Sequence, residues 1–155
     1  MKYDHSISKR FGFSLIGDTI VRKKAYAHNE AKLYSIEAIC QHFIHYPDPM
    51  VVPVYNFKIL EKPIFKHSRR LYQYDMKRLY MLNKEEKLLI NDNYRKGCHY
   101  HDDKNGYPKL VKFMNKVIEQ RKYLDIHDQN ILKDEDGNYR LIDLEGFVDI
   151  EKWIK

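Results

Sequence analysis

Hydrophobic and polar residues follow two different periods along the chain, and the period changes near its middle. In the first half, branched and aromatic residues form short runs typical of strands. Gly17-Asp18 is a suitable pair for a tight turn between the first two runs. Asn29 can cap a helix whose apolar residues recur at helical spacing. The predicted elements are two strands within 11–24, a helix at 29–45, and strands at 51–60 and 69–76.

The second half predicts mainly helices, followed by one hairpin. The pattern suggests a short helix at 79–92 and a clearer one at 108–122, where Pro108 suits the first turn. The apolar stripe of that second helix consists of Leu110, Phe113, Met114, Val117 and Ile118. Ile131-Leu132 and residues 139–143 then predict two short strands joined by a turn at Asp136-Gly137.

This change of pattern places a boundary near Met76-Lys77. We therefore expect an α+β fold with a sheet-rich part at 1–76 and a mainly helical part at 77–155. A chain of 155 residues can bury a core of its own, and its 43% hydrophobic content excludes a wholly disordered protein.

Charge and cysteine content narrow the class of protein. The net charge of +6 favours phosphate-bearing or acidic partners without naming one. Cys40 and Cys98 are too few for a disulfide framework and predict free thiols in a reducing compartment. Neither a secretory signal nor an apolar run of about 20 residues is present, so we expect a cytoplasmic protein with no membrane partner.

The candidate chemistry lies in residues 123–146, YLDIHDQNILKDEDGNYRLIDLEG. Asp125 falls on a predicted loop, Asn130 at its end, and Asp143 at the end of a predicted strand. Carboxylate and amide oxygens of this kind are ligands for a hard cation such as Mg²⁺.

The pattern D-x-x-x-x-N-I-L, a hairpin, and then two apolar residues before an aspartate resembles the catalytic loop and metal-binding strand of the protein-kinase-like superfamily. This superfamily includes protein kinases, aminoglycoside and choline phosphotransferases, and reduced kinases of phage and bacterial effectors. The resemblance implies a minimal two-lobed fold, with residues 1–76 as a sheet-rich N-lobe with one helix and 77–155 as a truncated, mainly helical C-lobe. It also implies ATP and Mg²⁺ as cofactors.

The resemblance assigns roles residue by residue. Asp125 matches the catalytic aspartate, which accepts or orients the proton of the attacking hydroxyl. Asn130 and Asp143 match the two positions that hold the metal. Val21, Leu132 and Ile142 match the residues that enclose adenine, and Tyr74–Met76 match the hinge that contacts it.

The family also has a strand lysine that binds ATP phosphates and pairs with a helix glutamate. Lys23 and Lys24 compete for the first role, and period-two alternation favours Lys23, because it places Val21 on the same face. Glu30 and Glu37 compete for the second role. Glu37 is preferred because it lies two turns further into the predicted helix.

Several residues depart from the pattern of protein kinases. Tyr123 replaces the usual histidine of the catalytic loop, and Asp143-Leu-Glu-Gly146 replaces aspartate-phenylalanine-glycine. His127 and Glu145 are more similar to small-molecule phosphotransferases. A glycine-rich loop is missing before Phe11, and the sequence has no room for an activation segment after Asp143, as in reduced effector kinases.

These features predict an ATP- and Mg²⁺-dependent phosphotransferase acting on a protein hydroxyl, with a protein substrate or host partner, inside a host cell if it is an effector. A small-molecule acceptor is one alternative, and a pseudokinase-type protein-binding module is another. A small basic nucleic-acid-binding domain is the last. It is less favoured because tyrosines and basic residues are interleaved throughout the chain rather than along one strand.

Overall fold

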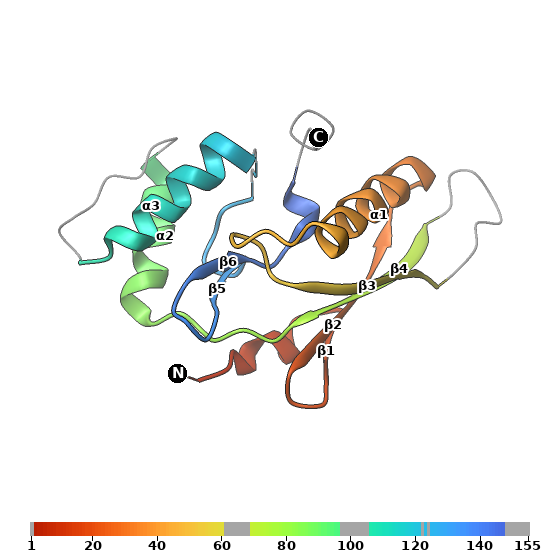
Figure 1. The fold of residues 1–155 in the computed structure, drawn as a ribbon, viewed down its shortest axis with the longest axis horizontal. Helices are drawn as coiled ribbons and strands as arrows, with labels where there is room; N and C mark the ends of the chain where they lie inside the picture. Colours follow the sequence, from red (N-terminus) through yellow and green to blue (C-terminus); the bar gives the residue numbers. More distant parts are fainter. Residues whose placement is uncertain (1, 61–68, 97–105, 122, 124, 148–155) are drawn as a thin grey trace. The chain divides into compact units, whose positions relative to one another are not determined.

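The computed structural model mixes helices with an antiparallel sheet, as the sequence predicts (Figure 1). Its contacts divide the chain into two compact units, one of Tyr3–Arg78 and the other of Met1–Lys2 with Leu79–Lys155. None of the helices in the described part of the chain is both long and apolar enough to span a membrane. The structure describes residues 2–60, 69–96, 106–121, 123 and 125–147.

The first unit contains a four-stranded antiparallel sheet in the order β1-β2-β4-β3. Gly17, with a φ of +67°, forms the tight turn predicted between β1 and β2. The third predicted strand begins later than expected, after Pro53, since proline has no N–H to give to a sheet ladder. The strand bounds are β1 (Phe13–Ile16), β2 (Ile20–Ala27), β3 (Val54–Ile59) and β4 (Arg70–Lys77).

Helix α1 (Glu30–His45) packs against this sheet, chiefly over β3 and β4. Asn29 caps it as predicted, because its side-chain oxygen accepts a hydrogen bond of 2.8 Å from the backbone N–H of Lys32. Tyr72, Tyr74 and Met76 of β4 form the buried face of the sheet. The predicted stripe of α1 is buried throughout and consists of Leu33, Ile36, Ile39, Cys40 and Phe43. Cys98, the other predicted free thiol, lies outside the described residues.

The opposite face of the sheet carries a cluster of polar side chains that come from three strands. The guanidinium of Arg22 on β2 donates to both carboxylate oxygens of Asp75 on β4, at 2.8 and 3.1 Å. Asn56 on β3 donates to the same carboxylate at 3.1 Å. The hydrogen bonds from Arg22 are the main reason that the pKa of Asp75 lies below its ordinary value.

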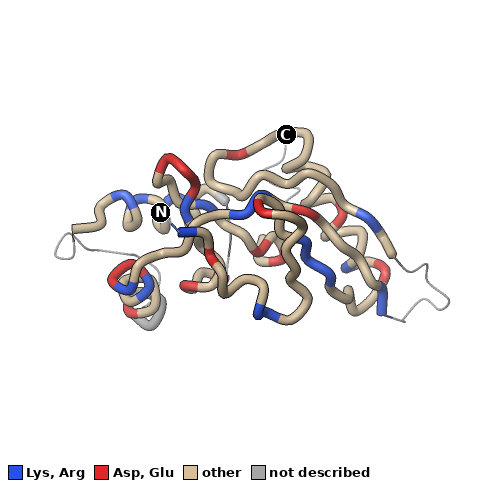
Figure 2. The backbone as a smooth tube through the Cα atoms, turned by 90° about the horizontal axis from the view of Figure 1, so that it is seen from below, with Lys and Arg blue, Asp and Glu red and all other residues tan. Residues whose placement is uncertain are grey.

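The second unit combines helices with a short hairpin. Helix α3 (Pro108–Lys116) continues into a π-helical turn at Val117–Arg121, within the helix predicted for 108–122. Four of the five residues of its predicted stripe are buried, and Ile118 is half-buried. The hairpin pairs β5 (Ile131–Lys133) with β6 (Tyr139–Leu141) through the predicted turn at Gly137. Acidic and basic residues are interspersed along the backbone (Figure 2).

Helix α2 (Lys84–Lys96) begins later than the sequence pattern predicts. The backbone of Tyr80 is extended and exchanges two hydrogen bonds with Lys133 of β5, at 2.8 and 3.0 Å. Asn83 then caps the helix, with its side-chain oxygen accepting from the N–H of Glu86 at 2.8 Å. The carboxylate of Glu86 accepts in return from the N–H of Asn83 at 3.0 Å. This reciprocal capping box fixes the start of the helix.

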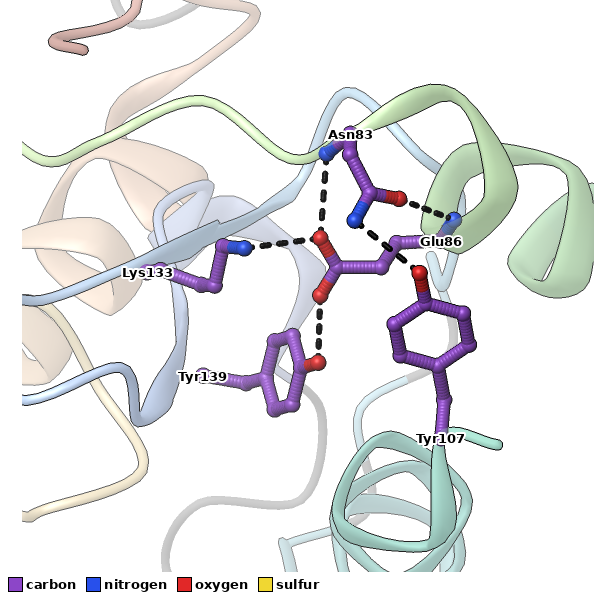
Figure 3. Close-up of polar contacts among 5 residues, drawn as sticks. All are labelled: Asn83, Glu86, Tyr107, Lys133 and Tyr139. Carbon is purple, nitrogen blue, oxygen red and sulfur yellow. Dashed lines mark hydrogen bonds and ion pairs between the residues drawn. The ribbon is translucent and has the colours of Figure 1, made fainter. Parts of the chain in front are cut away.

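Glu86 also joins α2 to the hairpin (Figure 3). Its carboxylate is almost fully buried and accepts hydrogen bonds from Lys133, at 2.7 Å, and from the hydroxyl of Tyr139. Burial alone would raise the pKa of Glu86, but the hydrogen bonds from Asn83, Lys133 and Tyr139 outweigh it and hold the pKa below its ordinary value. The pKa of Asp134 is likewise lowered, because bonds from Arg140 and two backbone N–H groups outweigh burial.

The lowered pKa values of these carboxylates predict that the folded protein loses stability in acid. A carboxylate whose pKa is lowered by folding stabilises the folded state. This contribution is complete when the pH is above the ordinary pKa, which is 3.8 for Asp and 4.5 for Glu. It is lost as the pH falls through the lower pKa that the group has in the folded state. We expect the free energy of unfolding, measured by urea denaturation, to stay level down to about pH 5 and to fall below it.

Glu86→Gln tests this prediction. We expect it to cost about 2–3 kcal/mol at pH 7 and to flatten the acid decline, because the titrating buried carboxylate is gone. Glu85→Gln is the matched control, since Glu85 is an exposed neighbour in the same helical turn. A decline in Glu86→Gln that runs parallel to that of the wild type would contradict the assignment.

Candidate active site

The predicted catalytic loop is held by Asn130, which precedes β5 and is buried. Its side-chain amide donates to both the backbone carbonyl and the carboxylate of Asp125, at 2.9 and 3.0 Å. Its backbone carbonyl accepts from the N–H of Ile142, just after β6, at 3.0 Å. The structure thus brings Asp125 and Asn130 into direct contact and fixes both against the end of the hairpin.

Asp143 is tied to the same place through Tyr123. The Tyr123 hydroxyl is buried and donates to the backbone carbonyl of Asp143 at 2.7 Å. Burial raises the pKa of this hydroxyl far above its ordinary value, and the negative charges of Asp143, Asp125 and Glu145 raise it further. A hydrogen bond with the side chain of Asn130 lowers the pKa, but by less than burial raises it. Tyr123 therefore remains a protonated donor at every physiological pH.

The ring of Tyr123 requires the glycine at position 146. A Cβ added to Gly146 would lie 2.5 Å from two carbon atoms of that ring. Phe147 packs edge-on against the same ring, with its ring centroid 5.0 Å from that of Tyr123. Tyr123, which the sequence shows only as a replacement for histidine, therefore connects the predicted catalytic loop to the strand end that carries Asp143.

The donor chemistry of this cluster fits Mg²⁺. Asn130 and Asp143 supply an amide and a carboxylate, and Mg²⁺ in phosphotransfer sites is held by few protein ligands together with substrate phosphates and water. Among the residues that the structure describes, no three His, Cys, Asp or Glu side chains are grouped as a metal site. The set therefore does not resemble a metal site built from protein ligands alone, and the metal role of Asn130 and Asp143 stays a prediction.

His127 lies beside the remaining oxygen of Asp125. Its Nδ1 accepts a hydrogen bond from the backbone N–H of Gln129 at 3.1 Å, so in the neutral ring the proton is on Nε2. That Nε2 faces the Asp125 carboxylate at 3.6 Å. Because the Asp125 side chain is 51% exposed, its carboxylate remains open to an incoming hydroxyl.

Lys23 and Val21 share one face of β2, as the alternation argument requires. Lys23 is paired across the sheet with Phe13 and Tyr74, and its ammonium lies 5.4 and 5.8 Å from their ring centroids. Val21 is paired with Met76, and both are buried. Lys24, in contrast, is exposed.

The two candidate glutamates of α1 differ in their surroundings. Glu30 lies in the first turn and accepts a hydrogen bond of 3.1 Å from the hydroxyl of the exposed Tyr34. Glu37 lies further along the helix and is half-buried. The pairing of Lys23 with either glutamate stays a prediction.

Leu132 and Ile142, the predicted adenine contacts of the hairpin, are both buried. The register pairs Leu132 with Arg140, so period-two alternation places Leu132 and Ile142 on one face of the hairpin together with Asn130. Lys133 and Tyr139 lie on the opposite face, where both contact Glu86.

Comparison with known proteins adds little to this geometry. No protein-family model and no curated protein matches the chain. Solved structures with partial likeness to the chain include two of WbdD. One is its complex with the kinase inhibitor LY294002, at 17% identity and a TM-score of 0.44, covering 90% of this chain and 32% of that one.

The other is the bifunctional kinase-methyltransferase WbdD, at 15% identity and a TM-score of 0.41, covering 97% of this chain and 33% of that one. The chain spans about one third of the length of these proteins. With both TM-scores below 0.5, neither likeness carries an inference about fold or function.

The contact between Tyr123 and Gly146 can be tested by a double-mutant cycle. We expect Gly146→Ala to lower the free energy of unfolding by about 1–3 kcal/mol, because the added methyl group displaces the tyrosine ring. In a Tyr123→Ala background the same change should cost little, since the clashing ring is absent. Equal costs in both backgrounds, measured by chemical denaturation, would refute the contact.

Proposed function

We propose that the protein is an ATP- and Mg²⁺-dependent phosphotransferase with a minimal two-lobed, kinase-like fold. The supporting observation is that residues far apart in sequence share one polar cluster. The Asn130 amide bonds to Asp125, and the buried Tyr123 hydroxyl bonds to the backbone of Asp143. The Tyr123 hydroxyl is also hydrogen-bonded to the side chain of Asn130, so the three residues picked out by their spacing are connected through Tyr123 within one unit.

Each member of the cluster has a role that suits its surroundings. Asp125 accepts the proton of the acceptor hydroxyl, a role that its exposed carboxylate permits. Asn130 and Asp143 hold Mg²⁺, which neutralises charge on the phosphoryl group during transfer. Asn130 serves both roles, since it orients Asp125 through its amide nitrogen and leaves its amide oxygen for the metal.

Nucleotide binding is assigned to the residues that the resemblance to the protein-kinase-like superfamily implies. Lys23 binds ATP phosphates, paired with Glu37. The ammonium of Lys23 lies over the rings of Phe13 and Tyr74, whose faces attract a cation. The adenine is contacted by the buried apolar residues Val21, Met76, Leu132 and Ile142.

The acceptor is proposed to be a hydroxyl group of a protein. The half-exposed carboxylate of Asp125 supports this choice, because a side chain on a large partner must reach the catalytic oxygen from solvent. A small-molecule acceptor is the second candidate. It is favoured by His127, whose Nε2 faces that carboxylate at 3.6 Å and gives a second polar group beside it.

Phosphotransfer by purified protein tests the proposal. Wild-type protein is incubated with γ-labelled ATP and Mg²⁺, alone and with cell extract, beside Asp125→Asn and Asp143→Asn. Both changes should lower label transfer or ATP turnover at least about 100-fold, because they remove the base and a metal ligand. Asp136→Asn, in the exposed hairpin turn, is the matched control and should retain full activity.

Lys23→Ala and Lys24→Ala then separate the two candidate lysines. We expect only Lys23→Ala to lower activity and to remove thermal stabilisation by ATP–Mg²⁺.

Activity that is equal in the wild type and in both aspartate variants would exclude the proposed phosphotransferase function. Thermal stabilisation by ATP–Mg²⁺ without turnover would indicate the pseudokinase-type binding module instead. Salt-dependent binding of DNA or RNA, without thermal stabilisation by ATP–Mg²⁺, would indicate the nucleic-acid-binding alternative.

A further inference from the structure

A cavity of about 550 Å³ lies beside the first turn of α2, away from the candidate active site. Among the described residues that line it, four are lysines and none is acidic. All of them belong to the second unit. The lining residues are Lys2, Met81, Leu82, Asn83, Lys84, Lys87 and Lys133.

The walls of this cavity are fixed by contacts already present in the unit. The Asn83–Glu86 capping box sets the start of α2, and Lys133 is held by its bond to Glu86 (Figure 3). The amide of Asn83 also donates to the hydroxyl of Tyr107 at 3.1 Å. The backbone N–H of Met81 donates to the carbonyl of Lys2 at 3.0 Å, which anchors that residue in the wall.

The charge of the cavity remains positive after these contacts are counted. The Glu86 carboxylate is buried behind the wall and is engaged with Lys133 and Tyr139, so it offsets one of the four lysines. Lys84 is exposed and Lys87 half-exposed. Like charges gathered around one concave surface raise the local concentration of anions.

Apart from the lysines and Asn83, the wall is apolar. Leu82 is 2% exposed and Met81 is half-buried, and both lie beside the lysines. A volume of about 550 Å³ falls in the range of small-molecule sites, which combine apolar walls with a few polar groups. Lys133 and Leu132 are adjacent on β5 and therefore point to opposite faces of the hairpin, so the cavity is distinct from the proposed adenine contacts.

We propose that this cavity binds a small organic phosphate. The lysines hold its phosphate group, and Met81 and Leu82 contact its apolar part. This proposal does not depend on phosphotransfer, because none of its residues belongs to the candidate active site. A cavity lined by lysines, with no acid among its described lining residues, selects a compact anion, and the apolar part of the wall accommodates the attached organic group.

Binding of inorganic pyrophosphate in the presence of EDTA, measured by titration calorimetry, tests the charged part of the proposal. We expect Lys84→Ala/Lys87→Ala to raise the Kd at least about 10-fold, because two of the four lining lysines are removed. Asp143→Asn should bind as the wild type does, since it alters only the candidate active site.

Lys112→Ala/Lys116→Ala is the control for net charge, because both lysines are exposed on α3 and lie outside the cavity lining. If this control weakens binding as much as the cavity variant does, pyrophosphate is attracted only by the net charge of the protein, and the proposal fails. Lack of pyrophosphate binding by the wild type would also overturn it. Circular dichroism of each variant confirms that a loss of binding is not a loss of folding.

Phenyl phosphate compared with inorganic phosphate tests the apolar wall. We expect the wild type to bind phenyl phosphate several-fold more tightly, with this preference lost in Leu82→Ala. Equal affinities of the wild type for the two probes would exclude an organic phosphate as the occupant.

Discussion

The hydroxyl of Tyr123 has no access to water, and a buried hydroxyl of this kind must find its partner within the protein. Its partner is the backbone carbonyl of Asp143, which follows the second strand of the hairpin, whereas the loop after Tyr123 leads into the first strand. Leaving such a donor unpaired would cost about 1–3 kcal/mol, so loop and strand end are held in one arrangement. The geometry of the candidate active site depends on this bond, and Gly146 leaves the space that the ring requires.

A second buried polar group, the carboxylate of Glu86, positions the other face of the same hairpin. Its bonds to Lys133 and Tyr139 dock α2 there, whereas Asn130 and Leu132 lie on the opposite face. Because successive residues of an extended chain point to opposite sides, β5 and the residue before it can serve two separate surfaces. One surface carries the proposed phosphotransfer residues, and the other forms a wall of the lysine-lined cavity.

Patterns of period two and of helical spacing were sufficient to predict the sheet strands and α1, because in this unit the buried residues repeat regularly. The start of α2 was predicted five residues too early, since Leu79 and Leu82 fit a helical stripe although both are buried in a segment that precedes the helix. The sequence Asn83-Lys-Glu-Glu86 contained the better signal, namely a capping residue followed three positions later by glutamate. Local hydrogen bonding therefore determined this helix end rather than hydrophobicity.

The sequence by itself determined the local elements and the choice of Asp125, Asn130 and Asp143, because residue type and spacing are properties of the chain. It also determined that Lys23 shares a face with Val21, since a strand alternates regularly. Only the tertiary structure decided that Tyr123 bonds to Asp143 and that Glu86 joins α2 to the hairpin. Those contacts depend on which atoms become buried together, and burial depends on packing between segments that are far apart in sequence.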